Sequence, residues 1–332
     1  MAQRKANQTS SFVSFCQKLA GTEGTWGHDP AHFDGRFVQS TLEKTSKLFG
    51  PGRYFDLQVD GWEKLEQEPS PALTISNHSG GLLTLDAWGW VTAWYGHLSL
   101  SRPLHMLAHD AVFSLPALAQ RLARLGGLRA DFELGLRILR DEQRDLLLYP
   151  GGDVDTFRPY KDRYKVNFAG RKGYTRLALE SGAPIRPIAH AGAHETLIVL
   201  SSGKRIAEKM GLPKLIRAQI FPIYLCFPWG LSIGPLPQLP PPTKLRYKIG
   251  NLIEMPRKTW RETPDDALIE KIDQHTREQM QALLDQLQEE EEPSPWRDTA
   301  TRLLEKATQF AQQLFPSTKL LDRPLHAGES FL

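Results

Sequence analysis

A histidine and an aspartate in the first third of the chain are the side chains best placed for acid–base chemistry. The segment ALTISN (72–77) predicts a short buried strand that ends at His78, and Asp86 stands at the start of a predicted helix over residues 85–96. Ligands bind at the carboxyl ends of strands in α/β folds. A carboxylate on one ring nitrogen fixes the histidine tautomer and makes the other nitrogen more basic. His78 is therefore a candidate general base towards an alcohol, with Asp86, or less favourably Asp110, as its partner.

Other chemistries have weaker support. The two cysteines, Cys16 and Cys226, lie too far apart in the sequence to indicate a disulfide framework or a cysteine-based metal site. His190, His194 and Glu195 have a spacing similar to that of a metal-binding pair, but no third ligand group accompanies them, so no metal is expected. We expect direct attack by a substrate group rather than covalent catalysis by the enzyme.

The elements that must position these residues alternate between strand and helix. This order predicts an α/β domain over about residues 50–290. Strands are predicted at 54–59, 72–77, 105–109, 145–150, 183–192 and 245–253. Helices are predicted at 36–48, 85–96, 111–127, 132–143, 171–182 and 264–292, and the segment 61–71 is predicted to be a loop. We divide the chain into an N-terminal helical arm (1–50), a catalytic domain (51–292) and a C-terminal amphipathic helix and tail (293–332).

Composition narrows the class of protein. The 332 residues are 40% hydrophobic and 24% charged, which excludes wholesale disorder and fibrous folds. A net charge of +3, from 41 basic and 38 acidic residues, gives no support for a nucleic-acid partner. No run of about 20 clean apolar residues predicts a transmembrane helix, and no secretory signal is evident at the start. We therefore expect a cytoplasmic protein that is soluble or peripherally membrane-associated.

One segment could contact a membrane. A basic amphipathic stretch over 203–217, which includes Lys204 and Arg205, precedes an apolar run over 220–242 that is broken by prolines and glycines. Cationic residues beside aromatic ones suit the boundary between lipid headgroups and acyl chains. The predicted membrane contacts are Lys204, Arg205, Phe221, Tyr224, Phe227 and Trp229. The alternative is an ordinary surface helix that leads into a buried strand.

Four sequence blocks in order resemble the glycerolipid acyltransferases, the superfamily of glycerol-phosphate and lysophospholipid acyltransferases. The resemblance runs from about Tyr54 to Gln286. The blocks are VDGWEKL with PALTISNH (59–78), the group Phe113, Pro116, Arg124, Gly126 and Gly127, LLLYPGGDVD (146–155), and RKGYTRLALESGAPIRPI (171–188). The resemblance implies a mixed, mostly parallel sheet with helices on both faces and helical extensions at both ends.

The resemblance also implies a reaction. His78, oriented by Asp86, would deprotonate the hydroxyl of a glycerolipid or other lipid alcohol. That hydroxyl would attack the thioester of acyl-coenzyme A or acyl carrier protein, with no further cofactor. The implied substrate-binding residues are Asn77, Gly151, Gly152, Asp153, Arg158 and Lys161. A plain tight turn is the alternative for the two glycines, and a solvated basic surface is the alternative for Arg158 and Lys161.

The sequence departs from the family pattern at two places. Seven residues, rather than four, separate His78 from Asp86, because Ser79-Gly80-Gly81-Leu82 lengthens the loop. The third block reads Pro-Gly-Gly at 150–152, which is similar to the branch that acts on neutral acceptors such as diacylglycerol. Two alternatives to the acyltransferase therefore remain open: a catalytically inactive module that binds lipid, and a hydrolase of acyl thioesters.

Overall fold

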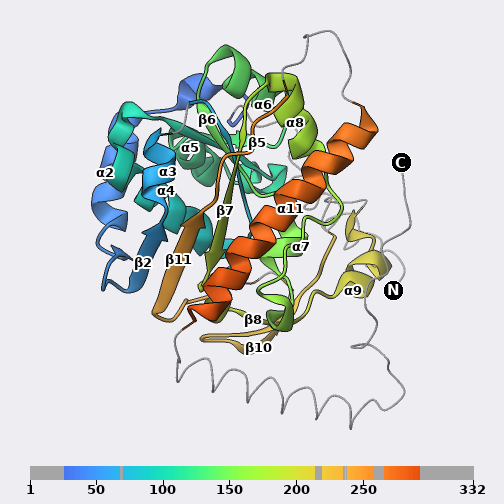
Figure 1. The fold of residues 1–332 in the computed structure, drawn as a ribbon. Coiled ribbons are helices and arrows are strands. Elements are labelled where there is room, and N and C mark those ends of the chain that lie inside the picture. The colour runs from blue at the N-terminus through green and yellow to red at the C-terminus, as the bar shows by residue number, and fades with distance from the viewer. Residues whose placement is uncertain are drawn as a thin grey trace, which may run out of the picture. The chain divides into compact units, whose positions relative to one another are not determined.

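An eight-stranded sheet organises the chain (Figure 1). The structure is a computed structural model and describes residues 26–67, 70–213, 219–234, 236, 238–256 and 265–291. In spatial order the strands are β1 (Phe49–Gly50), β2 (Phe55–Asp60), β11 (Thr243–Ile249), β7 (Ile185–Ala191), β3 (Leu73–Ser76), β6 (Asp145–Leu148), β4 (Leu104–Ala108) and β5 (Gly127–Arg129). All neighbouring pairs in this sheet are parallel except β11 with β7. The predicted mixed, mostly parallel α/β sheet is confirmed.

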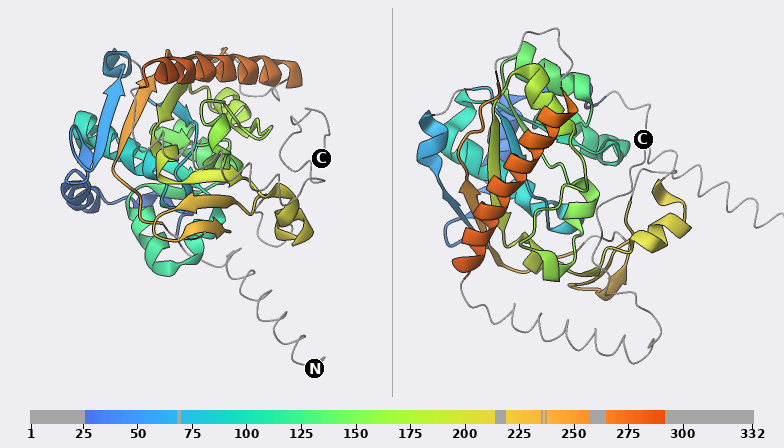
Figure 2. Two further views of the ribbon diagram at one scale, coloured as in Figure 1. Left: turned by 90° about the horizontal axis from the view of Figure 1, so that it is seen from below. Right: turned by 45° about the vertical axis from the view of Figure 1, so that its right-hand side comes forward.

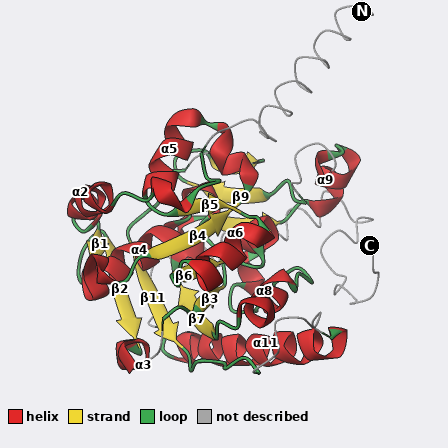
Figure 3. Cartoon of the chain, turned by 90° about the horizontal axis from the view of Figure 1, so that it is seen from above, coloured by secondary structure: helices red, strands yellow, loops and turns green. Residues whose placement is uncertain are grey.

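Helices cover both faces of this sheet (Figure 3). One core contains residues of α6 (Phe132–Leu136), α8 (Gly173–Ser181) and α11 (Asp266–Glu289). The other core contains residues of α2 (Gly35–Thr45), α3 (Trp62–Gln67) and α4 (Leu85–Leu98). A further helix, α5 (Pro116–Arg124), packs on α2. Neighbouring residues of one strand enter opposite cores: Leu146 belongs to the first and Leu147 to the second. All four residues of β3 are buried, as expected for a parallel strand that is covered on both faces.

A second sheet lies beyond the carboxyl end of β7. A short 3-10 turn, Ala193–Thr196, follows β7 and leads into β8 (Ile198–Ser201), which pairs antiparallel with β9 (Ile223–Cys226). β9 in turn pairs antiparallel with β10 (Gly230–Ile233). Figure 2 shows this small sheet with α9 (Lys204–Lys209) at one end. The proline-broken apolar run therefore includes a β-hairpin.

Two predicted elements were wrong in detail. The segment 61–71 contains the short helix α3 rather than only a loop. The predicted helix 111–127 is divided into a 3-10 turn (Asp110–Ser114), α5 and the start of β5. Pro116 explains the first division, because proline fits the first turn of a helix but interrupts a helix that would run through it from the preceding residues. Gly126 explains the second, because its φ of 94° lets the chain turn back into the sheet.

The terminal regions are described only in part. Of the predicted arm 1–50, residues 26–50 are described, and α2 contributes Val38 to the second core. The predicted tail, residues 293–332, and its amphipathic helix lie outside the described residues. In the part of the chain that is described, no helix is both long and apolar enough to cross a bilayer.

Candidate active site

His78 and Asp86 meet at the carboxyl end of β3. The Nδ1 atom of His78 lies 2.5 Å from Oδ2 of Asp86. The lengthened loop between them returns on itself through Gly80 (φ 95°) and Gly81 (φ 66°), both in the left-handed region that glycine adopts without strain. A side chain at position 81 would also collide with Leu197, whose Cδ2 would stand 2.7 Å from the added Cβ. The two glycines therefore compensate for the longer spacing.

Buried donors hold Asp86 in place. Its side chain is inaccessible to solvent, and its Oδ2 also accepts a hydrogen bond from the Ser79 backbone N–H at 3.0 Å. The Tyr247 hydroxyl donates to the backbone carbonyl of Asp86 at 2.8 Å. Burial raises the pKa of the Asp86 carboxyl, but the charge of His78 and its hydrogen bond lower that pKa more, so the net shift is downward. Asp86 is therefore an anion that can orient the His78 ring and stabilise its protonated form.

Among the described residues, one of the two ring nitrogens of His78 has a hydrogen-bond partner and the other has none. The ring stacks on Tyr149 with centroids 4.3 Å apart, and its side chain is 13% exposed. Nδ1 is engaged with Asp86, while Nε2 has no hydrogen-bond partner among the described residues. Burial lowers the pKa of His78, but the charge of Asp86 and their hydrogen bond raise it to above the usual 6.5. With Nδ1–H donating to Asp86, the lone pair of Nε2 can accept a proton from a substrate hydroxyl.

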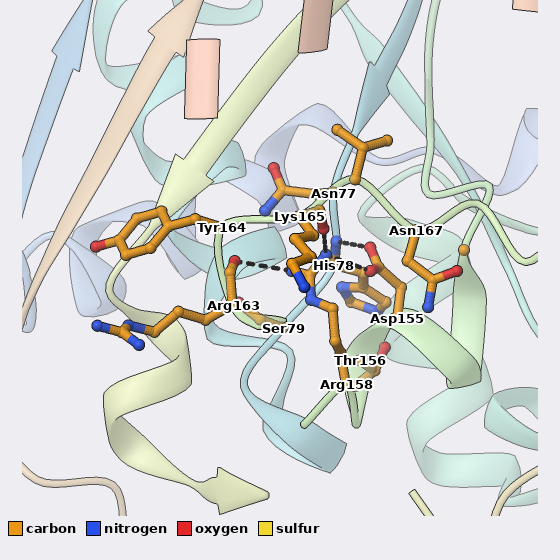
Figure 4. A network of polar contacts seen from close by, with 12 residues as sticks. Asn77, His78, Ser79, Asp155, Thr156, Arg158, Arg163, Tyr164, Lys165 and Asn167 are labelled. Atoms are coloured by element: carbon orange, nitrogen blue, oxygen red, sulfur yellow. Dashed lines mark hydrogen bonds and ion pairs between the residues drawn. The ribbon is translucent and has the colours of Figure 1, made fainter. Parts of the chain in front are cut away.

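An acid–arginine pair braces the backbone of His78. Oδ2 of Asp155 accepts the His78 backbone N–H at 2.6 Å, and Oδ1 lies 2.8 Å from Nη1 of Arg158 (Figure 4). Arg158 also donates to the backbone carbonyls of Lys165 and Arg163. Because Asp155 lies in α7 (Gly152–Thr156), this pair ties the glycine turn after β6 to the histidine after β3.

A second histidine lies behind the pair. Nε2 of His190, on β7, is 2.7 Å from the Ser79 hydroxyl and 3.6 Å from Oδ2 of Asp86. Burial lowers the pKa of His190 to about 4, so the ring is neutral at pH 7. His194 lies 3.2 Å from the Arg158 guanidinium, which disfavours a cation there. Within the described residues no group of three His, Cys, Asp or Glu side chains could hold a metal ion.

Several predicted substrate contacts have other partners in the structure. The Asn77 amide is buried and exchanges two hydrogen bonds of 2.9 Å with the backbone of His190, so it joins β3 to β7 instead of facing a ligand. Arg158 is 2% exposed and committed to Asp155, so the prediction that it binds the acceptor was wrong. Lys161 is exposed, and its role stays a prediction. Asp110 pairs with Arg129 at 3.2 Å rather than with His78.

The glycine turn after β6 is closed from one side by Arg171. The guanidinium donates to the carbonyls of Pro150 and Gly151 and pairs with Asp153 at 3.0 Å. A Cβ at Gly151 would lie 2.3 Å from the Asn167 carbonyl, and Gly152 has a φ of 50°. Both glycines are thus required by the local packing, and Asp153 is held beside the turn by an ion pair.

The predicted membrane contacts divide into two groups. Lys204, Arg205, Phe227 and Trp229 are exposed and Phe221 is half-buried. Tyr224 is fully buried, because it lies on the inward side of β9, where its ring packs near Phe157 and its hydroxyl bonds to the backbone of Leu236. The prediction for Tyr224 was therefore wrong.

A serine motif in β10 does not form a second catalytic centre. Residues 230–234 fit the pattern G-x-S-x-G, which in α/β hydrolases marks a strand-to-helix turn with an exposed nucleophile. Here Ser232 lies within a strand and is buried, and its nearest partners are Cys226 and the Gly230 carbonyl. The motif lacks the turn and the histidine that would activate the serine.

Sequence reasoning missed Ser79, Tyr149, Asp155 and His190 as parts of the site. Asp155 closes the third block and Ser79 directly follows the first, so their position beside the residues that were singled out was the available signal. His190 was noticed only as half of a metal pair. Nothing in the local sequence indicated that Tyr149 stacks on His78.

Comparison with known proteins finds one matching family model and several similar sequences. Residues 56–191 match the family model described as Acyltransferase. The uncharacterized protein Rv0502 of Mycobacterium tuberculosis is 30% identical over 239 residues, which cover 71% of this chain and 62% of that protein. The uncharacterized protein ML2427 of Mycobacterium leprae is 28% identical and is covered to 60%. This chain thus spans about three fifths of the length of these curated relatives.

A solved structure is also similar. The 1-acyl-sn-glycerophosphate (LPA) acyltransferase PlsC from Thermotoga maritima aligns with a TM-score of 0.43 and 14% identity, over 76% of this chain and 78% of that one. The family-model match covers His78, Asp86 and the glycine turn after β6, which are the residues that the site brings together. Over residues 56–191, which are fewer than half of the chain, the sequence is thus similar to the acyltransferase family.

Proposed function

We propose that this protein is an O-acyltransferase that moves a fatty acyl group from an acyl thioester to the hydroxyl of a glycerolipid or another lipid alcohol. The donor would be acyl-coenzyme A or acyl carrier protein. The observation that carries the proposal is the 2.5 Å contact between His78 and Asp86, which leaves Nε2 of His78 without a partner in the described structure, inside the segment that matches the family model.

The residues suggest a direct transfer. Nε2 of His78 accepts the proton of the acceptor hydroxyl while the oxygen attacks the thioester carbonyl carbon. The tetrahedral intermediate collapses, the carbon–sulfur bond breaks, and the thiolate takes the proton from the imidazolium. The products are an ester and a free thiol, and no bond to the enzyme forms. The buried Asp86 carboxylate stabilises the imidazolium in between.

The glycine turn after β6 is our candidate for contacts to the acceptor or to the developing oxyanion. It is linked to His78 by the bond from the His78 backbone to Asp155. Backbone N–H groups at turns of this kind can stabilise negative charge. Arg171 holds the turn by donating to the carbonyls of Pro150 and Gly151. Experiment must decide between a phosphate-bearing and a neutral acceptor.

The longer loop between His78 and Asp86 was the sequence feature that favoured an inactive lipid-binding module. That support is removed, because the two side chains are in contact despite the longer spacing. Hydrolysis of the thioester by water would use the same base and is distinguished by its product.

Transfer of a labelled acyl group from acyl-coenzyme A to lipid tests the proposal. We expect His78→Ala to lower incorporation by about 10²–10⁴-fold. His275→Ala, which alters an exposed histidine on α11, is the matched control and should retain incorporation. Equal incorporation by the wild type and His78→Ala would contradict the proposal, and release of free fatty acid without acylated lipid would replace the transferase with a hydrolase.

A further inference from the structure

The outer side of the β9–β10 hairpin departs from the pattern expected for a solvated sheet. The cross-strand pairs Leu225 with Leu231 and Ile223 with Ile233 lie on this side, where Leu231 and Ile233 are exposed. The inner side carries Tyr224, Cys226 and Ser232, all buried, so both sides of the hairpin are largely apolar. An antiparallel sheet with one face in water normally has polar residues outside and apolar residues inside. This outer face is therefore built to contact something other than water.

The apolar surface continues past the hairpin. Leu239 donates its backbone N–H to the Phe227 carbonyl at 2.9 Å, which joins the following segment to the hairpin turn. Over residues 219–239 the sequence contains no Asp, Glu, Lys or Arg. We call residues 223–239 the apolar ribbon. Its large side chains that are between 44% and 64% exposed are Phe227, Trp229, Leu231, Ile233, Leu236 and Leu239. So many exposed apolar side chains on one short segment indicate an interaction surface.

A cationic helix adjoins the base of the ribbon. α9 carries Lys204, Arg205 and Lys209, all exposed, and one acid, Glu208. Phe221, two residues before β9, is anchored next to this helix, because its backbone N–H donates to the Ser202 carbonyl at 3.1 Å. Apolar and aromatic side chains beside lysine and arginine complement an anionic lipid surface, with the rings among the acyl chains and the cations at the headgroups.

The inner side of the ribbon contacts the loop that carries the site. The Gln238 amide donates to the Gly80 carbonyl at 3.2 Å, between His78 and Asp86 in the chain. Tyr224 packs on Phe157, which directly follows α7 and its Asp155. A surface that binds the outer side of the ribbon would therefore lie next to the catalytic loop.

We propose that the apolar ribbon docks this protein on an anionic bilayer and holds the loop of His78 at the surface from which a lipid acceptor is drawn. The significance for catalysis rests on the proposed function, whereas docking itself does not. The occupant is the lipid surface, because the ribbon itself has no charged residue that could pair with a protein partner, while the cations of the adjoining α9 can meet anionic headgroups.

Vesicle co-sedimentation of the full chain tests the docking. The wild type should bind vesicles of phosphatidylcholine with phosphatidylserine more strongly than vesicles of pure phosphatidylcholine. The pair Leu231→Ser and Ile233→Ser should weaken binding by about tenfold or more, because two large side chains lose their apolar burial. The matched control, Leu115→Ser with Leu118→Ser, alters two leucines exposed elsewhere and should bind as the wild type does. Lys204→Glu with Arg205→Glu should weaken binding to the anionic vesicles only.

The outcomes separate docking from catalysis. Thermal unfolding of each variant shows whether it is folded, and the charge-reversal pair supplies a second test should the serine pair fail to fold. Absence of vesicle binding by the wild type overturns the docking, as does a serine pair that binds like the control. If the wild type does not bind vesicles but forms a dimer, and the serine pair is monomeric, then the ribbon binds a second copy of the chain and the membrane docking is overturned. His78→Ala should bind vesicles normally, so a loss of transfer with binding intact concerns the reaction alone.

Discussion

The two ends of the central strands each carry a buried carboxylate, and the two are used differently. Asp145, at the start of β6, accepts hydrogen bonds from Arg102, Arg186, Ser70 and the backbone of Ala72. Asp86, beside the end of β3, shares one oxygen between His78 and the backbone of Ser79. At the first end the charge is surrounded by arginines. At the second it is paired with a titratable ring whose other nitrogen is left without a partner among the described residues.

The difference separates a structural carboxylate from the carboxylate that we propose for catalysis. Asp145 is paired with two guanidiniums, which carry a permanent positive charge. A histidine can gain and lose a proton over the physiological pH range, and its partner Asp86 determines how readily His78 does so. Location agrees with this division, because α/β sheets bind ligands at the carboxyl ends of their strands.

Asp86→Asn should give the largest effect on activity. An amide can leave the His78 ring in the wrong tautomer and no longer stabilises the imidazolium, so transfer should fall by about 10³–10⁴-fold while the fold is kept. The measurement is kcat/KM for acyl transfer beside a thermal unfolding curve. Asp110→Asn changes the other aspartate that the sequence offered and should retain transfer. A comparable loss in both variants would contradict the assignment of Asp86.

Asp145→Ala should give the largest effect on stability. Removal of the carboxylate leaves Arg102 and the fully buried Arg186 without their shared anion, which costs about 3–5 kcal/mol in the free energy of unfolding. Urea denaturation measures this. Glu180→Ala, which removes the acid of an exposed pair with Arg176 on α8, should cost far less. If both variants lose the same stability, the contrast between the two ends of the strands does not hold.

Asp155→Asn should have an intermediate effect that involves both properties. The amide can still accept the His78 backbone N–H, but the buried Arg158 loses its counter-charge, at a cost of about 1–3 kcal/mol. We expect a reduced kcat, because the His78 backbone is less well fixed. Asp153→Asn, which alters the half-buried pair with Arg171, provides the comparison. Unchanged stability and kcat in Asp155→Asn would contradict the role of Asp155 in fixing the His78 backbone and in balancing the charge of Arg158.

The smallest effect concerns pH. Because the pKa of His78 is raised above 6.5, the base is protonated at a higher pH than a free imidazole. The rate should therefore fall on the acid side with an apparent pKa above 6.5. The sign for stability is opposite: the His78–Asp86 interaction contributes fully below 6.5 and is lost as the pH rises through the raised pKa. In Asp86→Asn the residual activity should fall on the acid side at a lower pH than in the wild type, because the Asp86 charge no longer raises the pKa of His78. An acid-side fall at the same pH in both proteins would show that another group controls the profile.

The sequence predicted the fold where local pattern and burial agree. β3, β6 and β7 are short segments of strand length rich in leucine and isoleucine, and their identification needed no tertiary information. α3 was missed because its six residues, which lie between Gly61 and the Glu68-Pro69 pair, carry almost no helical periodicity. The helix predicted over 111–127 failed at Pro116 and Gly126, where backbone restrictions overrule the apolar spacing.

The site was predicted only as far as its contacts are local. His78 and Asp86 are eight positions apart, and the resemblance to a family pointed to them. The bond between His78 and Asp155 joins positions 77 residues apart, and the one between Ser79 and His190 joins positions 111 apart. These contacts exist because β3 lies between β6 and β7 in the sheet, an order that no local pattern specifies. For the same reason Arg158 was expected at the substrate when it pairs with Asp155 inside the protein.

The measurement that tests the central claim most directly is single-turnover acyl transfer by His78→Ala, with its unfolding curve recorded on the same preparation. The account predicts transfer reduced by about 10²–10⁴-fold and a cooperative unfolding transition like that of the wild type. It also predicts that Asp86→Asn adds little further loss in the His78→Ala background, because the two side chains act as one unit. Transfer at the wild-type rate by a folded His78→Ala protein would contradict the account.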